Sequence, residues 1–271
     1  MTILFFFIYE ILNGGTNVKY VNLIYEKKKK VGYITLNRPE KRNALSIEVL
    51  NELNSLFKKI AEERKVHCVV VKGTGKVFSA GHDFNQIYNQ KPVDVEKLFL
   101  ACYKMMRGLR DLSQPVIAQV HGVATAAGCQ LVAACDLAVA EENTLFAIPG
   151  IKMAVFCSTP VVFVSRAIGR KRAFEMGFTG DYITARQASE WGLVNRVVSI
   201  ERLEETVKEL AQKIAGYSLS ALESAKRMFY QQLNMEDFQA LLYATEVITL
   251  NTSNDEAQRE IKAFLEGRKT S

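Results

Sequence analysis

The sequence is poor in the residues that build metal sites and disulfide frameworks. Its 271 residues include three histidines and five cysteines. No CxxC pair occurs among the cysteines, which stand mostly in apolar runs. A histidine-based metal site is therefore not expected, and the cysteines are predicted to be free thiols in a reducing compartment. We accordingly expect a cytoplasmic protein without a metal or a redox cofactor.

Long hydrophobic runs are also missing. The most apolar stretch, residues 3–12, is interrupted by Glu10 and is too short to span a bilayer. It lacks the basic flank and the cleavage site of a signal peptide. Strand-like patterning begins only near Val18, so we interpret residues 1–17 as an N-terminal extension that arises from an over-long gene start. No membrane partner is expected.

The charge balance is mildly basic, with a net charge of +6 and a pI of about 9.0. Such an excess favours anionic ligands, but it is far from a nucleic-acid-binding signature. Four consecutive lysines, Lys27 to Lys30, lie between two β-branched-rich runs and predict the tip of a hairpin. A phosphate or RNA contact is the alternative interpretation of this run. We favour a solvated turn and expect no nucleic-acid partner.

Strands, glycine loops and helices alternate through the first two-thirds of the chain, which predicts an α/β architecture. Buried strands are expected over 66–75, 115–124 and 136–142, with helices over 46–63, capped by Ser46, and 93–112. The remaining pattern is almost wholly helical, over 170–178, 185–192, 201–216, 218–232 and 234–266. We therefore expect a core over residues 18–200 and a helical C-terminal region over 201–271.

Two loops rich in small residues precede helices, "GTGKVFSAGHDFNQI" at 73–87 and "HGVATAAGCQL" at 121–131. Small residues let the backbone approach a ligand, and the free N–H groups of a helix start carry partial positive charge. Two such turns side by side can hold an oxyanion. The alternative is that the small residues serve only close packing. Neither loop is a Walker A sequence, and no G-x-S-x-G elbow occurs.

Four ordered segments carry a resemblance to a known family. They are "LNRPEKRNALS" (36–46), "FSAGHDFNQI" (78–87), "PVIAQVHGVATAAGCQLVAACDLAVA" (115–140) and "FAIPG" (146–150). Together they resemble the crotonase, or enoyl-CoA hydratase/isomerase, superfamily. "FCSTP" (156–160) and the segment 122–140 look most similar to its enoyl-CoA hydratase domain-containing protein 3 branch.

The resemblance implies a crotonase-like spiral of ββα units with a helical C-terminal trimerisation segment, in trimers or hexamers that bind acyl-CoA. CoA would arrive as part of the substrate. Two backbone N–H groups would polarise the thioester carbonyl and stabilise an enolate. By position in the motifs, we assign these donors to Ala80 and Ala127. Alanine at 127, where most members carry glycine, keeps the N–H, so the oxyanion hole is retained if the backbone there does not require a positive φ.

The same motifs place five residues beside CoA. Lys41 and Arg42 are expected partners for its phosphates, with solvated surface charge as the alternative. Ala44, Gly81 and Asp83 belong to the ligand-lining segments. For Asp83 we favour a structural role, in which its carboxylate caps the helix that follows.

Departures from the family pattern bear directly on activity. A hydratase of this family uses two glutamates, and the matching positions here hold Gln130 and Gly150. Glutamine can orient a water but cannot take a proton. Loss of a general acid/base typically costs about 10²–10⁴ in rate, so standard hydratase activity is not expected.

Other side chains could take over the lost chemistry. His82 is our first candidate acid/base, with a surface loop histidine as the alternative. Cys157 and Ser158 could face the acyl group, and Tyr103 is expected to be a pocket wall. His121, Cys129 and Cys135 are expected to be structural.

Two functional hypotheses follow. The leading one is an acyl-CoA enzyme of the hydratase/isomerase type in fatty acid metabolism, with an intact oxyanion hole and altered proton handling. The alternative is an acyl-CoA-binding protein without turnover.

Overall fold

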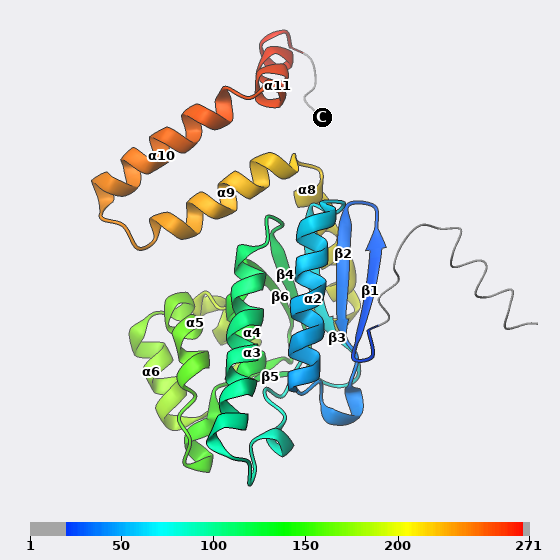
Figure 1. Ribbon diagram of the computed structural model, residues 1–271, viewed down its shortest axis with the longest axis vertical. Coiled ribbons are helices and arrows are strands. Elements are labelled where there is room, and N and C mark those ends of the chain that lie inside the picture. The colour runs from blue at the N-terminus through cyan, green and yellow to red at the C-terminus, as the bar shows by residue number, and fades with distance from the viewer. Residues whose placement is uncertain (1–19, 268–271) are drawn as a thin grey trace, which may run out of the picture.

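The computed structural model describes residues 20–267, and a six-stranded sheet forms its centre (Figure 1). The order in this sheet is β1 (Leu23–Lys28), β2 (Val31–Leu36), β3 (Cys68–Gly73), β4 (Val116–Val120), β6 (Leu137–Glu141) and β9 (Arg196–Val198). β1 and β2 pair antiparallel as a hairpin, and all later pairs are parallel. Parallel strands need crossovers, which the helices supply.

A second sheet of three short strands lies beside the first. Its order is β5 (Val123–Thr125), β7 (Leu145–Ala147) and β8 (Ile183–Thr184). The single strand expected over 115–124 is therefore two strands, since Gly122 turns the chain between β4 and β5 with a φ of +64°. β5 leads directly into α4 (Ala127–Ala134), whose start therefore lies at the edge of the small sheet.

Helices bury both faces of the large sheet. On one face α2 (Ile47–Glu63), α3 (Pro92–Asp111) and α4 bury their apolar side chains in the main apolar cluster. Ser46 caps α2 as expected, because its side chain accepts the Val49 N–H. On the other face α8 (Ile200–Ala215) packs its apolar stripe against β2, β3, β4 and β6. The expected domain boundary at residue 200 therefore falls inside the packed body.

The helical remainder includes one helix that the sequence pattern missed, α5 (Ser158–Ile168). It is followed by α6 (Arg170–Thr179) and α7 (Ala185–Trp191), and three short 3-10 turns lie at η1 (Pro39–Lys41), η2 (Phe84–Gln86) and η3 (Pro149–Met153). The long helix expected over 234–266 is wrong. It is two helices, α10 (Asp237–Thr252) and α11 (Asp255–Leu265), because Asn254 accepts the Ala257 N–H and caps a new start.

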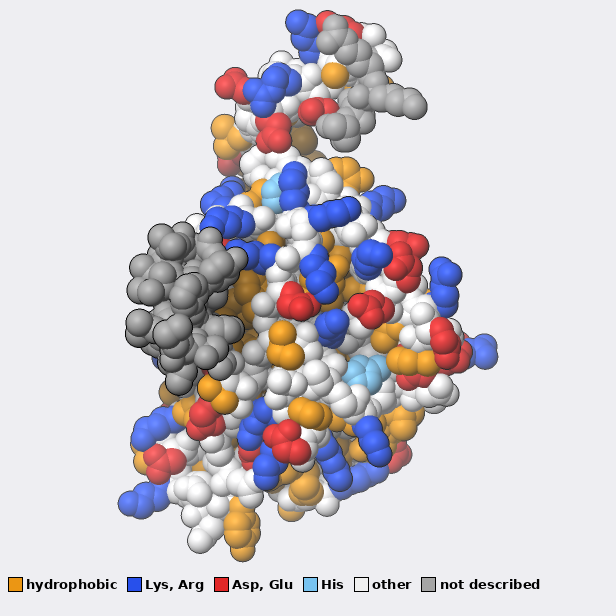
Figure 2. All heavy atoms as spheres, turned by 90° about the vertical axis from the view of Figure 1, so that its right-hand side faces the viewer, with side chains coloured by type: hydrophobic (Ala, Val, Ile, Leu, Met, Phe, Trp, Pro, Cys, Tyr) orange, Lys and Arg blue, Asp and Glu red, His pale blue; other side chains and the backbone are white. Residues whose placement is uncertain are grey.

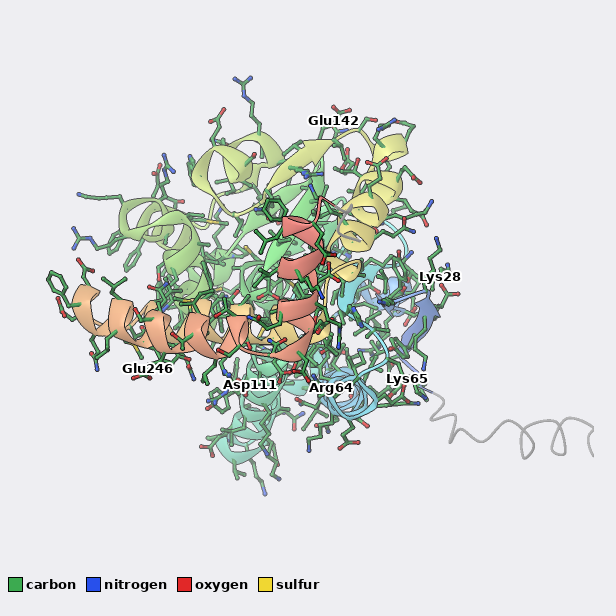
Figure 3. The ribbon with its side chains drawn as sticks, turned by 90° about the horizontal axis from the view of Figure 1, so that it is seen from above. Lys28, Arg64, Lys65, Asp111, Glu142 and Glu246 are labelled. Carbon is green, nitrogen blue, oxygen red and sulfur yellow. The ribbon has the colours of Figure 1, made fainter. Side chains whose placement is uncertain are left out.

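α9 (Leu219–Gln232) connects the body to α10 and α11, which lie apart from the sheet (Figures 1 and 3). Neither α10 nor α11 buries a residue. α9 is fastened to the body through Lys226, whose ammonium lies 2.8 Å from the Asp136 carboxylate. The Tyr230 hydroxyl donates to the other oxygen of Asp136 at 2.6 Å.

The lysine run lies at the turn of the β1–β2 hairpin, as predicted. Lys27 pairs with Glu63 and Lys28 with Glu26, each at 3.0 Å. Basic side chains on this face have acidic ones among them (Figure 2). Within residues 20–267, no helix has the length and apolar character needed to cross a bilayer. Residues 1–17, interpreted as an extension, lie outside the described residues.

Candidate active site

The two small-residue loops are packed directly against each other. Gly81 has a φ of +93°, a conformation that side chains rarely adopt. A Cβ atom at Gly81 would meet the Ala126 Cβ at 2.9 Å and the Ala127 backbone nitrogen at 3.1 Å. Glycine at this position therefore lets the first loop touch the start of α4.

Hydrogen bonding decides which amides of these loops are free. The Ala80 N–H donates to the Arg42 carbonyl at 3.0 Å. The prediction that Ala80 supplies an oxyanion donor is therefore wrong. Within the described residues, no acceptor receives the N–H of His82 or of Ala127. His82 in the first loop and Ala127 at the start of α4 therefore each offer an unpaired amide.

The pairing of His82 with Leu45 explains why its amide is free. The two residues form an isolated parallel bridge, in which Gly81 accepts the Leu45 N–H and Asp83 donates to the Leu45 carbonyl. In a parallel bridge the amide of the middle residue points the other way. The sequence carries no signal for this choice, because the pairing joins residues distant along the chain.

Alanine at 127 is compatible with a helix start. Ala127 is the first residue of α4, is fully buried, and is absent from the residues with positive φ. The strain falls one residue earlier, where Ala126 adopts φ 48° and ψ −119°. This combination is costly for a residue with a Cβ, and such strain is typical of functional sites.

Gln130 lies one turn into α4 and is 3% exposed. Its side-chain oxygen is buried and has no hydrogen-bond partner in the described structure. An unpartnered buried acceptor costs about 1–3 kcal/mol, so this oxygen is suited to a donor from a ligand or a water.

Gly150 has no room for a side chain. A Cβ atom there would lie 2.4 Å from the Val155 carbonyl oxygen and 2.8 Å from the Cys157 Sγ. The Gly150 N–H donates to that sulfur at 3.2 Å. The loop between η3 and α5 has thus closed over the position where a second carboxylate would begin.

His82 is a poor proton carrier in this setting. Its ring packs edge-on against Phe99 of α3, with centroids 4.9 Å apart. Burial lowers the pKa of His82 to about 4, and its Nε2 has no hydrogen-bond partner. The imidazole is therefore neutral at pH 7 and weakly basic.

Two residues that the sequence reasoning missed hold the 38–44 loop in place. The buried Asn43 accepts the Arg38 N–H through its side chain and donates to the carbonyls of Thr74 and Val77. The Arg38 guanidinium donates to the Ala44 carbonyl and lies 3.5 Å from the Asp83 carboxylate. The sequence carries one local signal for this role, which is the asparagine itself. Asn tolerates a positive φ, and Asn43 has a φ of 51° in the structure.

Lys41 and Arg42 extend from this loop into solvent, and neither pairs with a carboxylate among residues 20–267. Ala44 is buried beneath them. Asp83 has the structural role we favoured, since its carboxylate accepts the Asn85 N–H at the start of η2.

The other candidate side chains lie in structural positions. His121 bonds the Gly75 carbonyl at 2.9 Å. Cys129 and Cys135 are buried free thiols, and Cys157 is buried at the cap of α5, where desolvation raises its pKa. Tyr103 is 61% exposed and lines a groove between α3 and α2. No group of three or more His, Cys, Asp or Glu among the described residues could hold a metal.

Comparison with known proteins identifies the family. Residues 26–271 match the family described as Enoyl-CoA hydratase/isomerase, and the chain belongs to it. The chain is 40% identical over 237 residues to the mitochondrial enoyl-CoA hydratase domain-containing protein 3 of Rattus norvegicus, covering 87% of this chain and 79% of the relative.

Solved structures agree with this assignment. The crystal structure of an enoyl-CoA hydratase from Mycobacterium smegmatis aligns with a TM-score of 0.90 and 41% identity, covering 92% of this chain and 98% of the other. Human enoyl Coenzyme A hydratase domain-containing protein 3 aligns with a TM-score of 0.90 and 37% identity, covering 92% and 99%. The crotonase-like fold and the resemblance to this branch are confirmed.

The same comparison corrects the expected location. Relatives from rat, zebrafish, mouse and human are all named mitochondrial, which contradicts the expectation of a cytoplasmic protein. Free buried thiols indicate a reducing environment but do not distinguish one such compartment from another.

Proposed function

We propose that this protein binds acyl-CoA thioesters and holds the thioester carbonyl oxygen between the backbone N–H groups of His82 and Ala127. The observation that carries the proposal is that these two amides lack an internal acceptor although they stand on adjoining loops. A pair of fixed donors stabilises a developing oxyanion, each by roughly 3–4 kcal/mol. Lys41 and Arg42 would meet the CoA phosphates, since both are exposed and unpaired.

Proton handling differs from the two-carboxylate arrangement that the family resemblance implies. Gln130 is uncharged, Gly150 cannot carry a side chain without displacing the Val155 carbonyl, and His82 is neutral. We infer that this site retains carbonyl polarisation and enolate stabilisation from the chemistry that the family resemblance implies. Hydration of a simple enoyl thioester would be slow.

Calorimetry with a matched ligand pair tests the carbonyl contact. Crotonyl-CoA is compared with a thioether analogue in which a methylene replaces the carbonyl, and with free CoA. We expect the thioether to bind about tenfold more weakly or worse, which corresponds to about 1.4 kcal/mol. Equal affinities for crotonyl-CoA and the thioether would contradict a contact between the oxyanion hole and the thioester carbonyl. Loss of the enoyl-thioester absorbance on the same sample measures hydration.

A non-catalytic acyl-CoA-binding protein is the second candidate, favoured by the closed position at Gly150. Proton exchange separates the two functions. Incubation of butyryl-CoA with the protein in D₂O, followed by NMR, detects deuterium at the α-carbon. Exchange faster than in buffer alone supports enolate chemistry, and binding without exchange supports the carrier.

We further propose that the protein assembles as a homotrimer or hexamer through its C-terminal helices. α10 buries no residue. Its exposed apolar side chains include Phe238, Leu241, Leu242, Ile248 and Leu250. Apolar surface of this kind is typical of an interface. Light scattering during size exclusion measures the mass, and a monomer at micromolar concentration would contradict assembly.

A further inference from the structure

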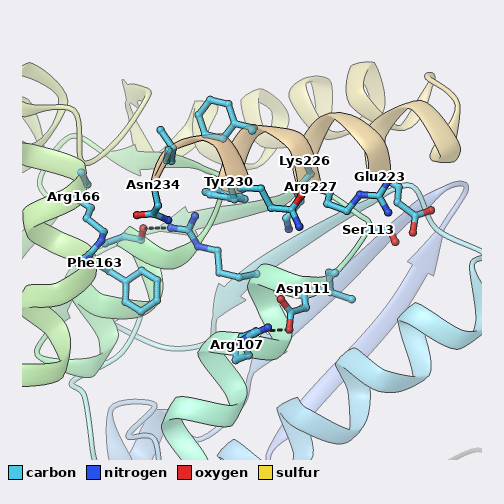
Figure 4. A pocket seen from close by; sticks show the side chains of 17 residues that line it. Arg107, Asp111, Ser113, Phe163, Arg166, Glu223, Lys226, Arg227, Tyr230 and Asn234 are labelled. Atoms are coloured by element: carbon cyan, nitrogen blue, oxygen red, sulfur yellow. Dashed lines mark hydrogen bonds and ion pairs between the residues drawn. The ribbon is translucent and has the colours of Figure 1, made fainter. Parts of the chain in front are cut away.

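A cavity of about 880 Å³ lies between the C-terminal part of α3, α5 and α9 (Figure 4). None of the residues around the oxyanion donors lines it. It meets α4 only at Ala133, at the opposite end from Ala127. Its volume falls within the range of pockets for small organic ligands, about 300–1,000 Å³.

Five basic and two acidic side chains line this cavity. Both acidic groups are already paired, Asp111 with Arg107 at 2.6 Å and Glu223 with Arg64 at 2.8 Å. Lys226 is neutralised by Asp136. The remaining three are Arg110, Arg166 and Arg227, and none lies within 4.0 Å of a carboxylate of the described residues. The cavity therefore presents three guanidinium groups without an ion-pair contact, although Arg227 is still attracted by Glu223 one turn earlier on α9.

Arg110 is held in a fixed position. Its guanidinium lies over the Tyr230 ring, 4.0 Å from the centroid, and 5.3 Å from the Phe163 centroid. It also donates to the Ala133 carbonyl at 3.3 Å. The Nε atom, however, is buried and has no hydrogen-bond partner. A buried charged donor without an acceptor is costly, so the Nε is an unused donor behind the wall of the cavity, and a ligand would meet the outer part of the guanidinium.

The wall of the cavity on α9 is fixed by hydrogen bonds within the protein. Tyr230 is held through its hydroxyl to Asp136, and the Lys226 ammonium adds bonds to the carbonyls of Leu109 and Gln114. Arg166 and Arg227 are exposed and extend from α5 and α9 on two sides of the opening (Figure 4). A ligand would thus need little rearrangement of the protein.

We propose that this cavity binds a small organic anion with two or more negative charges on phosphate or carboxylate groups. Its anionic oxygens bind Arg110, Arg166 and Arg227, and its apolar part packs on Leu112 and Phe163. Guanidinium groups recognise planar or tetrahedral oxyanions through paired hydrogen bonds. This site is independent of acyl-CoA binding at the other end of α4.

Calorimetry on the full-length protein, with sodium chloride holding the ionic strength constant, tests the site with pyrophosphate and with citrate. The two probes separate a phosphate preference from a carboxylate preference. We expect one saturable site per chain for at least one probe. The double variant R166Q/R227Q, in which both changed side chains are exposed, should weaken binding tenfold or more. The variant R202Q removes one exposed arginine of α8 outside the cavity and shows the effect of a single lost charge, which is doubled for comparison with the double variant.

Three outcomes would overturn the proposal. The first is that neither probe shows saturable binding up to millimolar concentration. This result is also expected if a second copy of the chain fills the cavity. The second is equal binding by R166Q/R227Q and the unchanged protein. The third is an equal loss in R202Q after this doubling, which would indicate a general charge effect. The variant R110K keeps the charge but removes the planar guanidinium, and we expect it to weaken binding.

Discussion

The backbone N–H of Gly150 donates to the Sγ of Cys157 at 3.2 Å, and this contact occupies the space from which a side chain at 150 would extend. The loop therefore has no room for a side chain at position 150, where the family resemblance implies a carboxylate. A reverse substitution to glutamate would meet the Val155 carbonyl, which belongs to the backbone and cannot rotate away.

Gly150→Ala is expected to destabilise the protein by about 1–3 kcal/mol, because its Cβ overpacks the closed loop. Adding Cys157→Ala should recover only part of the loss, since the Val155 carbonyl remains. Chemical denaturation measures both. Gly108→Ala is the matched control, because its Cβ meets no atom closer than 3.6 Å inside helix α3. That control should be neutral or stabilising, by up to about 1 kcal/mol. Equal stability of the two alanine variants would refute the closed position.

Gln130→Glu is expected to raise the rate of crotonyl-CoA hydration about tenfold or more, because it returns a proton-transferring group to the site. At 3% exposure the new carboxyl is desolvated, which should raise its pKa and reduce stability as the pH rises through that value. The absorbance assay and denaturation at two pH values measure these effects. Gln130→Ala is the control. A glutamate variant that binds crotonyl-CoA normally yet hydrates it no faster than the alanine variant would contradict this role for position 130.

Ala126→Gly is expected to stabilise the protein by about 1 kcal/mol, because glycine adopts φ 48° and ψ −119° without steric cost. The same change at Ala127, which has helical geometry, should destabilise it by about 0.5–1 kcal/mol. Thermal or chemical unfolding of the two variants measures the difference. If Ala127→Gly proves the more stable of the pair, the strain is not at Ala126.

The pKa of His82, lowered to about 4 by burial, predicts a specific pH dependence of stability. Between that value and the ordinary value of about 6.5, the unfolded chain binds a proton that the folded chain does not. Stability should therefore fall as the pH drops from about 6.5 to 4, by at most about 1.4 kcal/mol per pH unit from this group.

His82→Gln should flatten that slope. Denaturation as a function of pH measures the slope, and NMR titration of the imidazole measures the pKa itself. A His82 pKa near 6.5 would restore this residue as a candidate acid/base at neutral pH.

Much of the fold could be predicted from the sequence because its signals are local. The Ser46 cap, the hairpin around the lysine run and the helices that follow Arg170 depend on neighbouring residues and on apolar periodicity. The start of α11 was missed although Asn254 is a recognisable cap. The apolar periodicity on both sides of residues 251–255 led to the prediction of one continuous helix.

The sequence by itself determined the family, the two small-residue loops and the presence of Gln130 and Gly150 in their motifs, since each is a matter of residue identity. Only the tertiary structure decided that Ala80 is already bonded to Arg42, that His82 offers its amide instead, and that Gly150 has no space beside Cys157. The three arginines without carboxylate partners also come together only in space, from α3, α5 and α9. An amide's partner, the room for a Cβ and the pairing of a charge all depend on segments distant in the chain, which no local pattern encodes.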